Sequence, residues 1–361
     1  MKHTAPPPER LGQLPRIAQW AFLLALSALF AFLIDWAGLP AALLLGPMLA
    51  AIVSGVNGAT VRPKRPLFWA GQAVVGVLIA SSIEWRIVQF ILEDWPLIGG
   101  AVVATLLASS ILGYGISRWT ALPGTTGVWG SAPGAASAMV LMADAFGADA
   151  RLVAFMQYLR VIMVSGAAAL VAGLWVDTST VAGPPPAPWF PPIEPQAFAA
   201  TLGVALAGGL LGRALCLPTP FFLGSMIVGI ALHLGLDLSF QLPRWLLGLS
   251  YAMIGWTIGL NFTRPVLFHA ARALPQVVGS ILALMIFCGG IAFLLTKLLG
   301  LDPLTAYLAT SPGGMDSVAI IAAASGKVDL SFVMALQMAR FLLVLLVGPP
   351  LARLVSRTVK E

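Results

Sequence analysis

The chain has 361 residues, of which 59% are hydrophobic and only 9% are charged. Soluble domains carry about 25% charged residues, so this composition excludes a water-soluble globular protein and predicts a surface that faces mainly lipid. The formal net charge is +6, but the basic residues lie in short connections between apolar runs. They belong there as orientation signals and form no basic domain that would bind nucleic acid.

Apolar runs follow one another along the whole chain. A helix needs about 20 residues to cross the bilayer core, and several runs approach or exceed that length: 17–34, 96–117, 152–176, 195–212 and 273–296. Further runs are shorter or contain glycine but still have the character of spans: 39–56, 67–83, 217–236 and 245–262. The sequence therefore predicts an all-α polytopic membrane protein.

A proline-rich segment without Lys or Arg, residues 177–193, divides the chain into two halves. It predicts a stiff, extended linker between a first membrane repeat, 17–176, and a second, 194–357. A basic tail, 1–16, precedes the first repeat. Because basic residues are enriched on the cytoplasmic side, we expect both termini in the cytoplasm and the linker in the periplasm.

The two halves share a pattern in which a proline-glycine break is followed by a glutamine and an arginine. Corresponding positions lie 178 to 180 residues apart. The pattern consists of Ser131, Pro133, Gly134, Gln157 and Arg160 in the first half, and of Ser311, Pro312, Gly313, Gly314, Gln337 and Arg340 in the second.

This pattern predicts two repeats, each with about five transmembrane helices plus a broken or re-entrant helical hairpin. An odd number of spans inverts the second repeat relative to the first. Whether residues 120–146 dip in and return or cross fully stays open, and the distribution of Lys and Arg favours the re-entrant form. Gly46-Pro47-Met48 also recurs as Gly224-Ser225-Met226, which predicts close helix packing.

Pro133 and Pro312 predict interruptions in two membrane helices. A proline removes an amide donor and clashes with the preceding turn, and the glycine after it frees the backbone. In the bilayer such backbone survives only inside protein or beside a water-filled cavity. The helix that resumes after each break points free N–H groups toward it, which favours an anion. The alternative is a pair of kinks that only shape packing.

Arg160 and Arg340 each lie 11 residues after an aspartate, Asp149 or Asp329, that we expect to cap its helix. At about 1.5 Å per residue, the arginines lie roughly 16 Å along their helices, near the middle of the bilayer. The glutamine three residues earlier shares the helix face, and the pair offers donors suited to a carboxylate or similar oxyanion. The alternative is that each arginine binds the loose carbonyl groups of the neighbouring broken helix, and both roles can coexist.

One acidic residue, Asp316, lies beside a break, and Ser137 takes its place in the first half. Its carboxylate is expected to pair with an arginine or to take a coupling proton or Na⁺. No metal site and no cofactor are predicted, because the three histidines are scattered. The candidate substrate-binding residues are Ser131, Pro133, Gly134, Ser137, Gln157, Arg160, Ser311, Pro312, Gly313, Gly314, Asp316, Ser317, Gln337 and Arg340.

The duplicated pattern resembles the AbrB family of bacterial inner-membrane proteins, which is defined by an internal duplication. The resemblance covers about 17–357 and is carried by Leu45-Gly46-Pro47-Met48-Leu49, Leu223-Gly224-Ser225-Met226-Ile227 and the two proline-glycine segments. It implies a multi-pass protein of the bacterial inner membrane. Members are often labelled ammonia monooxygenase or regulator of gene expression. Oxygen activation needs a metal held by clustered ligands, or a flavin or haem, so the residues do not support the enzyme label and no catalytic residue is predicted.

We predict secondary transport of a small anionic solute, with its site at the interface of the two broken helices. Coupling to H⁺ or Na⁺ stays open. The alternative is a membrane regulator or sensor that acts indirectly on gene expression, and a membrane monooxygenase ranks last. The expected partners are the lipid bilayer and the solute, but not nucleic acid. A homodimer also stays open, and the sequence does not identify the solute or the direction of transport.

Overall fold

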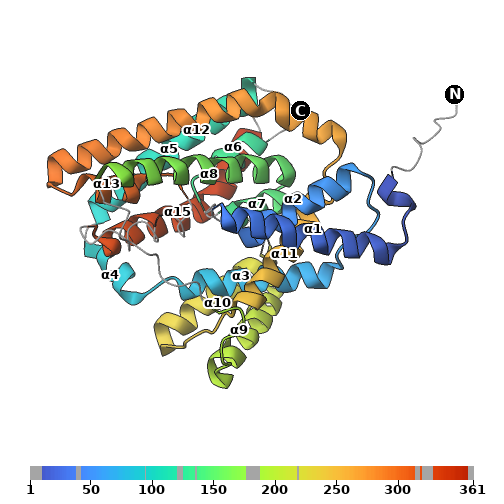
Figure 1. Ribbon diagram of the computed structural model, residues 1–361. Helices are drawn as coiled ribbons and strands as arrows, with labels where there is room; N and C mark the ends of the chain where they lie inside the picture. Colours follow the sequence, from blue (N-terminus) through green and yellow to red (C-terminus); the bar gives the residue numbers. More distant parts are fainter. Residues whose placement is uncertain are drawn as a thin grey trace. The chain divides into compact units, whose positions relative to one another are not determined.

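The computed structural model describes residues 10–37, 42–93, 95–119, 125–134, 136–175, 188–217, 219–313, 318 and 328–356. Every regular element in these ranges is a helix (Figure 1). The prediction of an all-α protein is therefore confirmed.

Five helices of the described residues are long and apolar enough to cross a membrane. They are α1 (Arg16–Trp36), α5 (Trp95–Trp119), α9 (Pro195–Ala214), α12 (Arg264–Leu299) and α15 (Leu330–Ser356). Helix α12 begins nine residues before the predicted run at 273–296, because Arg264 and Arg272 interrupt the apolar pattern without ending the helix. Its 36 residues span roughly 54 Å, well beyond a bilayer core of about 30 Å, so it must tilt or extend beyond the membrane.

The helices form two compact units, and each unit takes residues from both halves of the chain. The first unit comprises Met1–Ser81 and Ala187–Phe268, and the second comprises Ser82–Pro186 and His269–Glu361. In its described part the first unit holds η1 (Arg10–Gln13), α1, α2 (Ala42–Val56), α3 (Arg65–Ser81), α9, α10 (Pro220–Leu236) and α11 (Arg244–Gly259). The described part of the second holds α4 (Trp85–Glu93), α5, α6 (Thr126–Ser131), α7 (Ala136–Ala145), α8 (Ala150–Trp175), most of α12, α13 (Pro303–Thr310) and α15.

Small residues bring the helices of the first unit into contact. Helix α2 packs against α1 and α11, and α10 packs against α9 and α3. A Cβ atom on Gly46 would lie 2.4 Å from the backbone nitrogen of Ala31, and one on Gly224 would lie 2.1 Å from the carbonyl oxygen of Gly208. These helices meet backbone to backbone, which confirms the predicted role of the two glycine motifs in close packing.

In the second unit, α6 packs against α5, α7 and α8, while α15 packs against α4, α5 and α13. Glycines again permit the closest approach: a Cβ atom on Gly127 of α6 would lie 2.7 Å from the carbonyl oxygen of Gly113 of α5. The short helix α6 is thus held against two long helices.

Two short helices of the second unit stop at the proline-glycine segments. Helix α6 ends at Ser131, where Ala132 adopts φ −60° and ψ 124°. Helix α13 ends at Thr310, where Ser311 adopts φ −56° and ψ 134°. Both extended residues directly precede a proline, which disfavours the helical conformation of its predecessor. The structure therefore has an interruption at each position predicted from Pro133 and Pro312.

Both interrupted segments return to the place where they begin. The amide of Asp149, at the start of α8, donates to Thr126 Oγ1, at the start of α6, over 3.1 Å. In the second half the amide of Asp329 donates to Thr305 Oγ1 over 3.2 Å. The two ends of each segment therefore lie together.

The two aspartates also cap the helices that follow. Asp149 Oδ1 accepts a hydrogen bond from the amide of Arg151, and Asp329 Oδ1 accepts one from the amide of Phe332, each over 3.0 Å. Such bonds satisfy amides that have no partner within the helix. The prediction that these residues are N-caps is confirmed.

Candidate functional site

Gln157 of α8 binds the end of α6. Its side-chain Nε2 donates to the carbonyl oxygens of Trp129, at 2.8 Å, and Ala132, at 3.0 Å. The last carbonyl groups of a helix have no partner within it. Gln157 satisfies two of them at the first break.

Arg160, one turn further along α8, binds the same break. Its Nη1 donates to the carbonyl oxygens of Ser131 at 3.4 Å and Ala132 at 2.8 Å. Its Nη2 donates to the carbonyl oxygen of Gly134 at 3.3 Å and to Gln157 Oε1 at 2.7 Å. The two terminal nitrogens of the guanidinium group are thus occupied by protein acceptors.

Gln337 and Arg340 of α15 repeat this arrangement at the second break. Gln337 Nε2 donates to the carbonyl oxygens of Leu308 at 2.8 Å and Ser311 at 3.1 Å. Arg340 Nη1 donates to those of Thr310 at 3.2 Å and Ser311 at 3.0 Å, and its Nη2 donates to Gln337 Oε1. Gln337 and Arg340 therefore bind the carbonyl groups of the second break as Gln157 and Arg160 bind those of the first.

The hydrogen bonds also define the residue correspondence at the breaks. Arg160 binds the carbonyl group of Ser131 where Arg340 binds that of Thr310, so Ser131 corresponds to Thr310. The prolines and the carbonyl partners correspond at a spacing of 179 residues, whereas the glutamines and arginines correspond at 180.

One hydrogen bond joins the two breaks. Arg340 Nε donates to the carbonyl oxygen of Pro133 over 3.0 Å, linking residues 207 positions apart. From the other side, a Cβ atom on Gly313 would lie 3.0 Å from Val164 Cγ1 of α8. The second-half arginine thus holds the first-half break, and the second-half break lies against the first-half helix.

The two guanidinium groups are buried, with Arg160 1% exposed and Arg340 2% exposed. The ion pairs of the described residues join Arg151 to Asp149 and Arg244 to Asp35. In the described part of the chain, the charges of Arg160 and Arg340 are therefore balanced by backbone carbonyl dipoles at helix C-termini, not by carboxylates. These contacts match the alternative in which the arginines bind the loose carbonyl groups.

The other candidate residues differ in their position relative to the breaks. Pro133, Gly134, Pro312 and Gly313 form the breaks, and Ser137 lies half-buried in the first turn of α7. Gly314, Asp316 and Ser317 lie outside the described residues.

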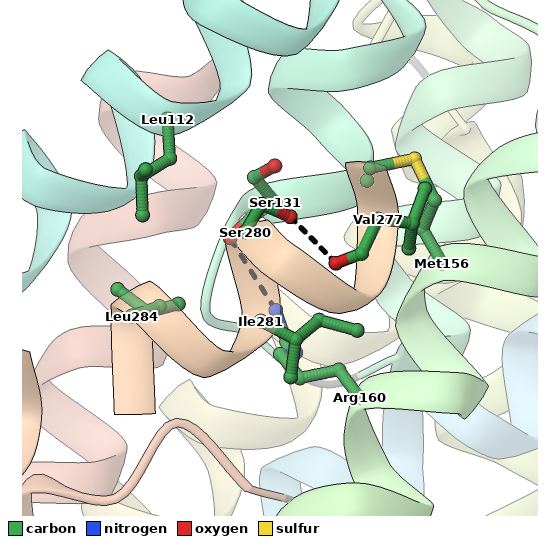
Figure 2. Close-up of a pocket in the computed structure, with 9 residues that line it drawn as sticks. Leu112, Ser131, Met156, Arg160, Val277, Ser280, Ile281 and Leu284 are labelled. Carbon is green, nitrogen blue, oxygen red and sulfur yellow. Dashed lines mark hydrogen bonds between the residues drawn. The ribbon is translucent and has the colours of Figure 1, made fainter. Parts of the chain in front are cut away.

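A small cavity of about 10 Å³ lies beside the first break (Figure 2). Two buried polar atoms of its lining residues, Ser131 Oγ and Arg160 Nε, have no hydrogen-bond partner in the described part of the chain. The remaining lining residues come from α5, α6, α8 and α12: Leu112, Gly130, Met156, Val277, Ser280, Ile281 and Leu284.

The contribution of α12 to this cavity was not predicted. Val277, Ser280, Ile281 and Leu284 form one face of an ordinary apolar helix, and no break, charge or repeat marks them in the sequence. Only the packing of α12 near the break reveals them. In the described residues, no group of three or more His, Cys, Asp or Glu side chains could hold a metal ion.

Comparison with known proteins identifies the family. The family model described as "Transition state regulatory protein AbrB" matches residues 43–356. "Putative regulator AbrB" of Escherichia coli (strain K12) is 44% identical over 340 residues, covering 94% of this chain and 97% of the relative. "Uncharacterized protein YhjN" of Bacillus subtilis (strain 168) is 23% identical over 375 residues, covering 92% of each chain. The resemblance inferred from the repeated motifs is confirmed, and the chain belongs to the AbrB family.

Proposed function

We propose that this protein is a secondary transporter of a small anionic solute, and that the solute passes the meeting point of the two interrupted helices in the second unit. The observation that carries the proposal is the hydrogen bond from Arg340 Nε to the carbonyl oxygen of Pro133. It places Arg340, which binds the second break, in contact with the backbone of the first break in the protein interior.

Interrupted helices favour transport over a purely structural role. Non-helical backbone at membrane depth is tolerated only within protein or beside a water-filled cavity, and many transporters build their sites from discontinuous helices. In this chain the arrangement is doubled, with matched carbonyl contacts for Arg160 and Arg340. Two equivalent breaks that meet are what a site between two repeats requires.

The interrupted segments support an inverted relation between the halves. Because the two ends of each interrupted segment lie together, we propose that it adds no crossing, which leaves the five spans that the sequence predicts for each repeat. An odd number reverses the direction of the second repeat. We propose on this basis an internal duplication with inverted repeats in the bacterial inner membrane. Both termini then lie in the cytoplasm and the 177–193 linker lies in the periplasm.

The charge of the site favours an anion. Arg160 and Arg340 bring two buried positive charges, and the ion pairs of the described residues include neither of them. Asp316 supplies at most one negative charge, and its proposed role is to pair with an arginine or to take a coupling H⁺ or Na⁺. A cationic cargo would add to the existing repulsion, whereas an anion relieves it.

Flux through sealed vesicles tests this function. A thermal-shift screen of organic acids, amino acids and small inorganic anions on the purified protein would first identify a ligand. Vesicles loaded with that ligand should then exchange it with labelled ligand outside only when they contain the protein. A ligand that binds but does not cross would reject transport.

The second candidate is a membrane sensor that uses the same site to alter a partner protein. The name of the Escherichia coli relative, "Putative regulator AbrB", favours it. A sensor would bind the solute without moving it, so the vesicle assay separates the two functions. Neither function assigns a catalytic residue.

A further inference from the structure

The cavity beside the first break contains two unsatisfied buried donors. Arg160 is 1% exposed and Ser131 is 7% exposed, and Arg160 Nε and Ser131 Oγ have no partner among the described residues. Buried polar atoms are satisfied in more than about 90% of cases. Two unpaired donors among the residues that line one cavity therefore point to a ligand in that cavity (Figure 2).

The geometry of the guanidinium group explains why Nε is left over. Both terminal nitrogens are engaged by the carbonyl oxygens of the break and by Gln157. These contacts fix the orientation of the group, so Arg160 cannot turn to use Nε elsewhere without losing them. The corresponding Nε of Arg340 donates to the carbonyl oxygen of Pro133. Of the two arginines, Arg160 is therefore the one whose Nε has no acceptor among the described residues.

The second hydroxyl group of the cavity, that of Ser280, is already engaged. Ser280 Oγ donates to the carbonyl oxygen of Val277 over 2.8 Å (Figure 2). It can still accept a hydrogen bond but has no second proton to donate. The free donors are thus the N–H of Arg160 and the O–H of Ser131.

Size and charge define that acceptor. The cavity volume of about 10 Å³ is close to the minimum for one water molecule, so only one atom of comparable size can enter. Water would satisfy the donors but would not relieve the repulsion between the buried positive charges of Arg160 and Arg340. A halide, or one oxygen of a small oxyanion, would satisfy the donors and relieve this repulsion. The flexible side chain of Met156 on the cavity wall can adjust to the slightly larger radius of a halide.

We propose that this cavity binds one atom of a small monovalent anion between Arg160 Nε and Ser131 Oγ. The inference deepens the proposed transport function and rests on it for the identification of the anion as cargo. It narrows the solute to a halide or a small oxyanion that offers one acceptor atom to the first break.

Bromide is the probe for this site. The full-length protein in detergent is titrated with sodium bromide at constant ionic strength, with sodium gluconate as the replaced salt, because gluconate is too large for the cavity. We expect a saturable rise in Tm for the wild type. Ser131→Ala should raise the bromide Kd at least about tenfold, since it removes a hydrogen bond to a charged group.

The matched control is Ser109→Ala. Ser109 is also a buried serine of the second unit, but its Oγ donates to the carbonyl oxygen of Leu106 and it does not line the cavity. This variant should keep the wild-type bromide Kd. Ser131→Ala should fold normally, because the lost hydroxyl has no partner among the described residues. Anomalous scattering from crystals grown in bromide gives an independent readout of the position.

Each outcome decides the point. Saturable bromide binding that weakens in Ser131→Ala alone supports the site. No saturable effect in the wild type, or an unchanged Kd in Ser131→Ala, would overturn it. Bromide binding without vesicle flux would support the site and reject transport. Flux of another solute at the same rate in the wild type and in Ser131→Ala would support transport and reject the site.

Discussion

Arg160 and Arg340 are buried among backbone carbonyl groups, each beside a glutamine of its own helix. A buried carbonyl group that loses its donor costs about 1–3 kcal/mol. An arginine is suited to this role because its planar fork reaches several acceptors at once and remains charged. The same side chains that hold the helix ends in place therefore also set the positive charge of the site.

Removing the guanidinium group of Arg340 should destabilise the protein. Arg340→Ala leaves carbonyl groups of both breaks without a donor, so we expect the free energy of unfolding to fall by about 3 kcal/mol or more. Unfolding in mixed detergent micelles gives the value. Arg213→Ala, at an exposed position of α9, should change it by less than about 0.5 kcal/mol. Equal effects of the two variants would show that the carbonyl contacts of Arg340 contribute little.

The chemistry of the site could be predicted at the level of single residues because the sequence repeats it. A glutamine and an arginine on one helix face, after a proline-glycine break, indicated carbonyl binding, anion binding or both. The contacts show carbonyl binding, and anion binding is part of the proposal. The link from Arg340 to Pro133 could not be predicted, because it joins the repeats rather than recurring in each.

At the scale of elements, glycines set how closely helices approach. In α10, the Cβ position of Gly224 is blocked by the carbonyl oxygen of Gly208 on α9, whereas that of Gly235 meets no atom within 4 Å. Two glycines of the same helix thus differ only in what faces them. The first is required by packing, and the second is not.

These two glycines give a matched prediction. Gly224→Ala forces α9 and α10 apart and should lower the free energy of unfolding by about 1–3 kcal/mol. Gly235→Ala gains helix propensity at an open position and should raise it by up to about 1 kcal/mol. Thermal unfolding of both variants in one detergent measures the difference. A loss of stability in Gly235→Ala as large as that in Gly224→Ala would contradict the packing argument.

The sequence predicted most helices because apolar runs and proline-glycine breaks are local signals. The predicted run at 195–212 corresponds to α9, Pro195–Ala214. Non-local contacts leave no such signal. The re-entrant form of the interrupted segments was favoured from the distribution of Lys and Arg, but the contacts between residues 23 or 24 positions apart that bring the segment ends together were not predicted. The cavity-lining face of α12 depends on packing that leaves no mark in the sequence.

At the scale of the whole molecule, each compact unit combines helices from both halves of the chain. Helices of both units come into backbone contact at glycines, but the second unit also contains both breaks and both buried arginines. The candidate site therefore lies within one unit. The arrangement accords with the proposed transport function, in which the second unit binds the solute.

The proposed orientation can be tested with single cysteines. After replacement of Cys216 and Cys288, a cysteine introduced by Ser179→Cys should react with a membrane-impermeant thiol reagent in intact cells. A cysteine introduced by Ser356→Cys should react only after the cells are opened, because basic residues hold the C-terminus in the cytoplasm. The reverse labelling pattern would overturn the orientation, and equal labelling of both in intact cells would contradict five spans in the second repeat.

The most direct test of the transport account is the exchange flux of the identified anion through vesicles containing either wild-type protein or Arg340→Lys. Lysine keeps the positive charge but cannot reach the carbonyl groups of both breaks at once. We predict flux in the wild type and, per folded protein, at least about tenfold slower flux in Arg340→Lys, as expected for the loss of a hydrogen bond to a charged group. Wild-type protein that binds the anion without moving it, or an Arg340→Lys variant that moves it at the wild-type rate, would contradict the claim that the joined breaks form the transport site.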